Sequence, residues 1–230
     1  MKSLTVIQHT SSEHLGWIED HLEARQIRFR YVRPFQAGSG VPAPASIGDG
    51  LALLGGGPWG AAGERDLPTL QEECALARDC LMANRLIIGF GLGAQILALA
   101  AEGGATPAPL ELRIGAGRRV TPDALNGYLP ERFPYAAYMR DWPQPPAYAK
   151  VLAVTEDDRP LIFQMGETAF GFACHPGFKR AMAEDLIMEF EEGPDNPAPA
   201  LQRLQSVGAE IADALVPIMT GLIQSTKLMR

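Results

Sequence analysis

The sequence has few cysteines and no cluster of basic residues, and both absences narrow what the protein can be. Its three cysteines, Cys74, Cys80 and Cys174, make an odd count without framework spacing, which argues against a disulfide scaffold and against a zinc site. Lysine and arginine total 20 against 27 aspartates and glutamates, giving a formal net charge of −7. We expect no nucleic-acid partner, because binding to phosphates needs clustered Lys and Arg.

Sequence features of export are not apparent either. The apolar segment at 4–7 is too short for the hydrophobic region of a signal peptide, and polar residues follow it at 9–12. Internal repeats and low-complexity tracts are not visible. We therefore expect a cytoplasmic protein with no membrane partner, and the sequence indicates no metal and no cofactor.

The sequence contains enough apolar residues for one large hydrophobic core, since 47% of its 230 residues are hydrophobic. Apolar runs alternate with segments of helical periodicity. This pattern predicts strands at 4–8, 27–32, 51–54 and 86–90, and helices at 17–25, 70–83 and 93–101. The unbroken apolar run at 86–90 is typical of a strand in the middle of a parallel sheet. The expected fold class is α/β, a doubly wound and mainly parallel sheet flanked by helices.

The second half of the chain shows shorter strands and a helical end. Strands are predicted at 110–114, 150–154, 161–164 and 169–173, as the rest of the sheet and an antiparallel extension, and a helix at 178–190. A linker at 193–197 leads to a helical region at 201–228, which Pro217 could kink. We therefore divide the chain into a domain, 1–192, and a C-terminal helical extension, 198–230, packed on that domain.

The C-terminal segment carries one long apolar stripe, because apolar residues recur every three or four positions. The stripe consists of Leu201, Leu204, Val207, Ile211, Leu215, Ile218 and Leu222. Such a stripe has to be covered, either by the helical layer of the same sheet or by a second copy in a homodimer or another partner.

Three predicted strands end in glycine-rich segments, at 54–58, 89–95 and 171–176. The carboxyl ends of parallel strands line a common crevice in folds of this class, and ligands bind there. The three segments therefore define a candidate site.

The second segment resembles the nucleophile elbow of class I glutamine amidotransferases, which runs Gly, any residue, Cys, Leu, Gly, any residue, Gln. Gly89, Leu92, Gly93 and Gln95 match this pattern, and the position of the cysteine holds Gly91. Gln95 is expected in the first turn of the following helix, where it makes either a structural hydrogen bond or a ligand contact.

The third segment resembles the same family's Gly, any residue, Gln, Phe, His, Pro, Glu motif. Gly171, His175 and Pro176 match, whereas Gly177 stands at the position of the glutamate. Cys174 precedes the histidine and is expected in the core, because neighbouring strand residues point to opposite faces.

The first segment resembles the loop that supplies oxyanion-hole amides in that family. Gly55, Gly56 and Gly57 would donate backbone N–H groups there, together with the amide of Leu92. Arg140 stands where members of the family often have histidine, and we interpret it as a solvated charge and not as an anion clamp.

The resemblance implies a Cys-His-Glu triad in which the cysteine attacks the side-chain amide of glutamine, the histidine transfers the proton and the glutamate orients the histidine. With glycine at 91 and 177, only His175 remains. The implied protein is a glutaminase-inactive binding or regulatory subunit, with a synthetase or another enzyme as partner and a small γ-glutamyl-like ligand.

Two other interpretations stay open from the sequence. In the first, the natural chain has a cysteine at position 91 and is an active amidotransferase or γ-glutamyl amide hydrolase. In the second, Gly89, Gly91 and Ala94 form a dinucleotide-binding fingerprint between a strand and a helix. That fingerprint normally follows the first strand of its unit, whereas here it occurs late in the chain.

Overall fold

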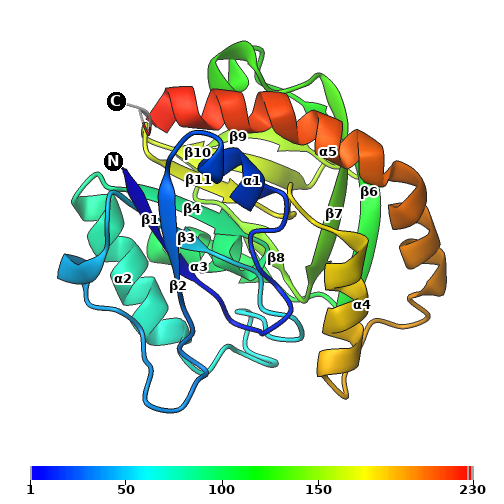
Figure 1. Ribbon diagram of the computed structural model, residues 1–230, viewed down its shortest axis with the longest axis horizontal. Helices are drawn as coiled ribbons and strands as arrows, with labels where there is room; N and C mark the ends of the chain where they lie inside the picture. Colours follow the sequence, from blue (N-terminus) through cyan, green and yellow to red (C-terminus); the bar gives the residue numbers. More distant parts are fainter. Residues whose placement is uncertain (1, 227, 229–230) are drawn as a thin grey trace.

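The computed structural model describes residues 2–226 and 228, and within this part of the chain nine strands form one twisted sheet with helices on both faces (Figure 1). The strands of this sheet are β1 (Ser3–Ile7), β2 (Arg28–Val32), β3 (Gly50–Leu53), β4 (Leu86–Phe90), β6 (Glu111–Arg119), β7 (Arg132–Met139), β9 (Lys150–Val154), β10 (Pro160–Met165) and β11 (Ala169–Phe172). Short strands β5 (Gly104–Thr106) and β8 (Trp142–Gln144) pair separately. The helices are α1 (Ile18–Glu23), α2 (Leu70–Met82), α3 (Leu92–Ala100), α4 (Arg180–Glu189) and α5 (Ala198–Thr226), with 3-10 turns η1 (Pro44–Ser46) and η2 (Ala124–Gly127).

The sheet has a parallel half and an antiparallel half. The strand order is β2-β1-β3-β4-β11-β10-β9-β6-β7. The first five strands run parallel, and each pairing from β11 onward is antiparallel. This arrangement confirms the expected α/β class, and it makes β3, β4 and β11 direct neighbours.

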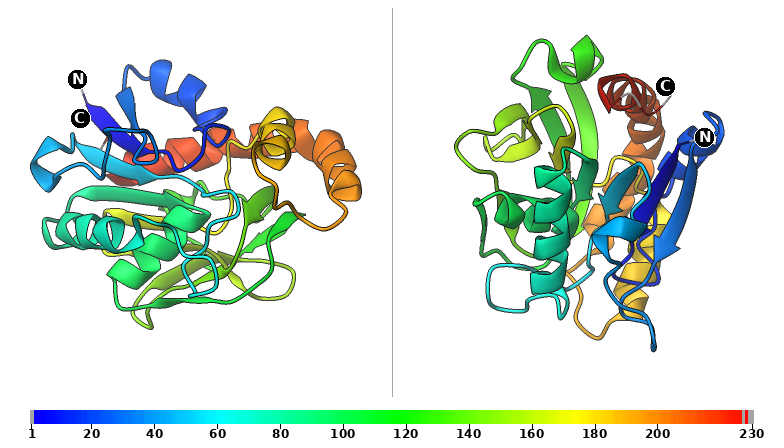
Figure 2. Two further views of the ribbon diagram at one scale, coloured as in Figure 1. Left: turned by 90° about the horizontal axis from the view of Figure 1, so that it is seen from below. Right: turned by 90° about the vertical axis from the view of Figure 1, so that its left-hand side faces the viewer.

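Helices α2 and α3 cover one face of the sheet, and α1, α4 and α5 lie on the other (Figure 2). The alternation of side chains along each strand produces this division. Leu51 and Leu53 of β3 pack in the cluster that contains α2 and α3, whereas Ala52 packs in the cluster that contains α1 and α5. Both faces are buried, which explains the unbroken apolar runs in the central strands.

The long helix α5 lies across β6, β7 and η2 (Figure 1). Leu204, Ile211, Leu215, Ile218 and Leu222 of the predicted stripe are buried, and Leu201 and Val207 are partly buried. By length and composition alone, this helix could also cross a membrane. In this structure, however, the apolar stripe packs on the protein itself. The helix continues through Pro217.

The sequence pattern does not predict β7, and it predicts an end for β6 that is too early. β7 contains Pro134, and a proline inside a run normally argues against a strand. β6 continues through Gly115 and Gly117 to Arg119, and these glycines interrupt the alternation that identifies a strand. Pairing between β6 and β7 along eight positions, from Glu111 to Arg118, overrides both weak local signals.

Candidate functional site

The three glycine-rich segments lie side by side at the carboxyl edge of the parallel half-sheet. Gly55, Gly91 and His175 follow the neighbouring strands β3, β4 and β11 within a few residues. Gly91 caps the first turn of α3 with φ 54° and ψ −115°, a backbone conformation that favours glycine. Its N–H donates to the carbonyl of Phe172 at 2.8 Å, so the elbow is fastened to β11.

Space remains in front of Gly91 where a side chain would stand. Apart from its chain neighbours, the one described atom that a Cβ at this position would meet within 4 Å is the Cα atom of Gly55, at 3.4 Å. Leu92 instead closes the site from the helix side, because its side chain lies directly against Gly56. The N–H of Gly93 donates to the carbonyl of Leu54 at 3.0 Å and joins the elbow to the glycine loop.

The imidazole of His175 has no free nitrogen. Its Nε2 donates to the backbone carbonyl of His14 at 2.8 Å, and its Nδ1 accepts the N–H of Gly177 at 3.2 Å. These two bonds require the neutral Nε2–H tautomer. Burial lowers the pKa of His175 to about 4, and its ring stacks on Phe90 with centroids 5.5 Å apart. The ring is therefore a neutral, packed group that is engaged with backbone on both sides.

Gly177 is a close-packing position. A Cβ atom there would lie 2.7 Å from the carbonyl oxygen of Leu15 and 2.9 Å from Cγ1 of Ile18. The carbonyl of Gly177 accepts the N–H of Trp17 at 3.0 Å, which fastens this segment to the chain just before α1. A larger residue at this position requires the backbone before α1 to move, so the space for an orienting glutamate is already filled.

A buried carboxylate that the sequence motifs do not indicate lies on the glycine loop. The carboxylate of Glu13 sits directly over the Cα atom of Gly55, and Oε2 accepts a long hydrogen bond of 3.5 Å from the N–H of Gly57. Glu13 is 2% exposed. Burial raises its pKa to about 7, although the loop N–H groups and the nearby His9 oppose this shift.

Below the loop, His9 forms a buried pair with Glu73 of α2. The Nε2 atom of His9 lies 2.8 Å from the Glu73 carboxylate, and Nδ1 lies 3.0 Å from the carbonyl oxygen of Gly55. Both partners are acceptors, so both ring nitrogens donate and the ring is an imidazolium. Burial alone would lower the pKa of His9, but Glu73 and the Gly55 carbonyl raise it. Thr69 completes the network by donating to Glu73 at 2.7 Å.

Two buried side chains near the crevice have polar atoms without a partner. Within the part of the chain that the structure describes, the hydroxyl of Tyr138 and the Oε1 atom of Gln95 make no hydrogen bond. Burial raises the pKa of the Tyr138 hydroxyl, and the negative charge of Glu13 raises it further. The Nε2 atom of Gln95 donates to the carbonyl of Arg140 at 2.7 Å, which makes its contact at least partly structural.

The interpretation of Arg140 as a solvated charge was wrong. Its side chain is 8% exposed, donates to the carbonyl of Pro58 at 3.1 Å, and forms ion pairs with Glu64 and Glu192. Long-range packing brings these acidic partners to it, which spacing along the chain could not show. Cys174 is buried at 2% exposure, as expected.

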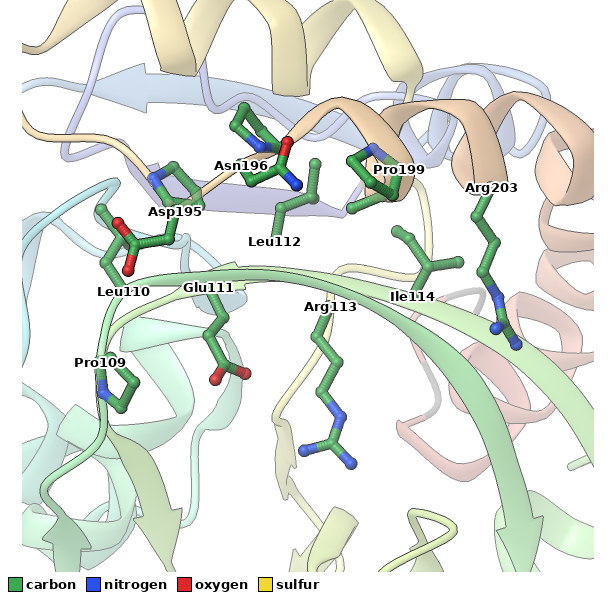
Figure 3. A pocket seen from close by; sticks show the side chains of 13 residues that line it. Pro109, Leu110, Glu111, Leu112, Arg113, Ile114, Asp195, Asn196, Pro199 and Arg203 are labelled. Carbon is green, nitrogen blue, oxygen red and sulfur yellow. The ribbon is translucent and has the colours of Figure 1, made fainter.

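A cavity of about 520 Å³ lies between β6 and the segment leading into α5 (Figure 3). Leu112, Asn196 and Arg203 are among its lining residues. The three glycine-rich segments contribute nothing to its lining, so this cavity is separate from the crevice at Gly91.

Known proteins share this architecture. No family model matches the chain. The Salmonella typhimurium glutamine amidotransferase-like protein YfeJ is 26% identical over 200 residues, which cover 80% of this chain and 77% of that protein. The crystal structure of a glutamine amidotransferase from Methylobacillus flagellatus superimposes with a TM-score of 0.81 at 23% identity, covering 98% of this chain and 95% of the other.

The chain has the glutamine amidotransferase fold. A second amidotransferase structure, from Thermotoga maritima, matches with a TM-score of 0.80 at 21% identity and covers 98% of each chain. The resemblance noted in the sequence motifs is thus confirmed by a named relative and by structural neighbours. A more distant neighbour, a GMP synthase subunit from Thermoplasma acidophilum, has a TM-score of 0.53 at 16% identity, covering 91% of this chain and 98% of that one.

Within this amidotransferase-like crevice, sequence reasoning identified the strand ends but missed three charged residues around them. His9 and Glu13 follow β1, which is the strand next to β3, and Glu73 comes from α2. One signal was available: in a parallel sheet, polar residues just after any strand reach the same carboxyl edge. Glu73 gave no such signal. Acidic residues are common in the first turn of a helix, because they interact favourably with the helix dipole.

Proposed function

We propose that this chain is a glutaminase-inactive amidotransferase-like protein that acts as a binding or regulatory subunit. The observation that carries this proposal is the state of His175. Both ring nitrogens bind backbone groups, at His14 and at Gly177, and the ring is neutral. A histidine bound in this way is not available to take a proton from a nucleophile.

Three further features support the absence of glutamine hydrolysis. Gly91 has no side chain, so no thioester can form at the elbow. Gly177 provides no carboxylate to orient His175 and leaves no room for one. The carboxylate of Glu13 lies on the loop whose amides would stabilise an oxyanion, and its negative charge opposes that developing charge.

The retained fold with a remodelled crevice favours binding over turnover. The candidate partner is a synthetase or another enzyme of the cytoplasm that would use the domain for regulation. A small γ-glutamyl-like ligand would bind at the elbow, where Gln95 has an unpartnered oxygen.

The proposal is tested by assaying ammonia release from glutamine with the purified chain. We expect no release above background from wild type, nor from Gly91→Cys, because His175 stays bound to His14 and cannot deprotonate the new thiol. His175→Ala is the control. Release by the wild-type chain that disappears in His175→Ala would overturn the proposal.

The alternative of a natural cysteine at position 91 needs a separate check. Sequencing the natural gene decides whether Gly91 is native. If the gene encodes cysteine, the Gly91→Cys protein is the natural enzyme, and covalent labelling by a glutamine-derived chloroketone measures whether its thiol reacts. Labelling that depends on His175 would favour an active amidotransferase.

A further inference from the structure

Glu13 is a buried carboxylate without a counterion. Among the residues that the structure describes, no ion pair joins its side chain, and the hydrogen bond that it accepts from Gly57 is long, at 3.5 Å. The imidazolium of His9 lowers the pKa of Glu13 through its charge, but it already uses one nitrogen for Glu73 and the other for the carbonyl of Gly55. A buried charge that lacks a partner of its own is costly, and proteins keep such groups mainly where they bind or react.

The surroundings of Glu13 offer both space and a second polar group. Gly55, which Glu13 covers, is also the residue that bounds the space in front of Gly91, at 3.4 Å from a Cβ atom placed there. Among the described residues, the buried hydroxyl of Tyr138 has no hydrogen-bond partner, and burial together with the charge of Glu13 raises its pKa. Glu13 and the unfilled side-chain position at Gly91 therefore both adjoin Gly55, and Tyr138 adds a buried hydroxyl that can still form a hydrogen bond.

We propose that Glu13 binds the primary ammonium group of a small ligand in the space in front of Gly91, with Tyr138 as a second hydrogen-bond partner. An ammonium group supplies the missing positive charge and up to three N–H donors. The amides of the glycine loop alone would favour an anion. The carboxylate of Glu13 reverses this preference, so the loop favours a cation. This inference rests on the proposed function in one respect, namely that the crevice binds rather than hydrolyses its ligand.

The test measures the shift in Tm of the full chain with methylammonium chloride against sodium chloride at equal ionic strength. Tetramethylammonium chloride is the matched control, because it carries the same charge without N–H donors. At about pH 8, where Glu13 is ionised, we expect methylammonium near saturation to raise the Tm by about 2–4 °C and tetramethylammonium to have no effect. At about pH 6 the shift should shrink, since Glu13, which faces His9, Glu189 and Tyr138, then holds a proton.

Glu13→Gln should abolish the methylammonium shift while keeping the shape of the side chain. Tyr138→Phe provides a second variant if Glu13→Gln does not fold, and we expect it to reduce the shift at least twofold. Equal shifts with both ammonium salts, no shift with either, or a full shift in the folded variants would overturn the inference. Because the assay reads binding and not ammonia release, such a result would leave the proposed glutaminase inactivity standing.

Discussion

His9 and Glu73 form a fully buried ion pair beneath the glycine loop, with Nε2 of the imidazole 2.8 Å from the carboxylate. The same imidazole holds the carbonyl of Gly55 at 3.0 Å. Because a peptide unit is planar and trans, fixing the direction of this carbonyl also fixes the opposite direction of the Gly56 N–H. The pair therefore sets the orientation of the loop on which Glu13 lies, and α2 is tied to the crevice through Glu73.

Removing Glu73 should destabilise the fold strongly. Glu73→Ala leaves the His9 imidazolium buried without its partner, and we expect a loss of about 3–5 kcal/mol in the free energy of unfolding. Urea denaturation followed by tryptophan fluorescence measures the loss. Glu72→Ala, at the exposed neighbouring position on the same helix, is the control and should change stability by less than about 0.5 kcal/mol. Equal stabilities for the two variants would contradict a buried charged pair.

Replacing Glu13 should change how stability depends on pH. Folded Glu13 keeps its proton up to about pH 7, whereas its ordinary pKa is 4.5. The folded state therefore binds more protons between these values, and stability falls as pH rises through this window, by up to about 3 kcal/mol. Glu13→Gln should be more stable than wild type by about 1–3 kcal/mol near pH 8 and almost unchanged near pH 5. The control Glu23→Gln, at an exposed position, should have the stability of wild type at both pH values. If Glu13→Gln gained the same stability at pH 5 as at pH 8, the charge of Glu13 would not be the cause.

His175 should remain neutral well into the acid range. Its pKa is lowered to about 4 by burial, so the stability it contributes is complete above its ordinary value of 6.5 and is lost as pH falls through 4. Two-dimensional ¹H–¹⁵N spectra of the imidazoles should show the Nε2–H tautomer of His175 down to about pH 5. His175→Asn assigns the signal. An imidazolium signal for His175 at about pH 6 would disprove the neutral, backbone-bound ring.

The two glycines at the triad positions should respond differently to substitution. Gly91→Ala has room for its methyl group and bears only the strain of a positive φ, about 1–3 kcal/mol. Gly177→Glu meets the backbone of Leu15 and buries a charge, so we expect a loss above about 4 kcal/mol or failure to fold. Gly193→Ala, where a Cβ atom meets nothing within 4 Å, is the control. Thermal unfolding ranks the three, and a stable Gly177→Glu protein would refute the close-packing role.

The stripe on α5 should behave as core and not as a free surface. Leu215→Ala removes a fully buried side chain between the helix and the sheet, and we expect a loss of about 2–5 kcal/mol. The adjacent Val216→Ala, at a side chain that is 50% exposed, should cost less than about 1 kcal/mol. Chemical denaturation measures the free energy of unfolding of both variants. Similar losses for Leu215→Ala and Val216→Ala would contradict the burial of this stripe against the sheet.

The sequence was sufficient for the architecture of the parallel half-sheet and for the strand ends that define the crevice. Unbroken apolar runs such as Leu86–Phe90 can only be buried on both faces. The glycines at 55, 91 and 177 were also identifiable, because each follows such a run in a known motif order. β7 was not predictable, because its pairing with β6 comes from long-range contacts that outweigh the local effect of Pro134.

What only the tertiary structure decided is what these glycine positions do. In the sequence, Gly91 and Gly177 look alike, because the motif resemblance predicts a triad position for each of them. In the structure, Gly91 faces open space, whereas the chain just before α1 packs onto Gly177, about 160 residues away along the sequence. The same loop after β1 brings Glu13 onto Gly55 and the His14 carbonyl onto His175. Local propensity and spacing determine strands and turns, but the charge and the free space of a site depend on residues that only folding brings into contact.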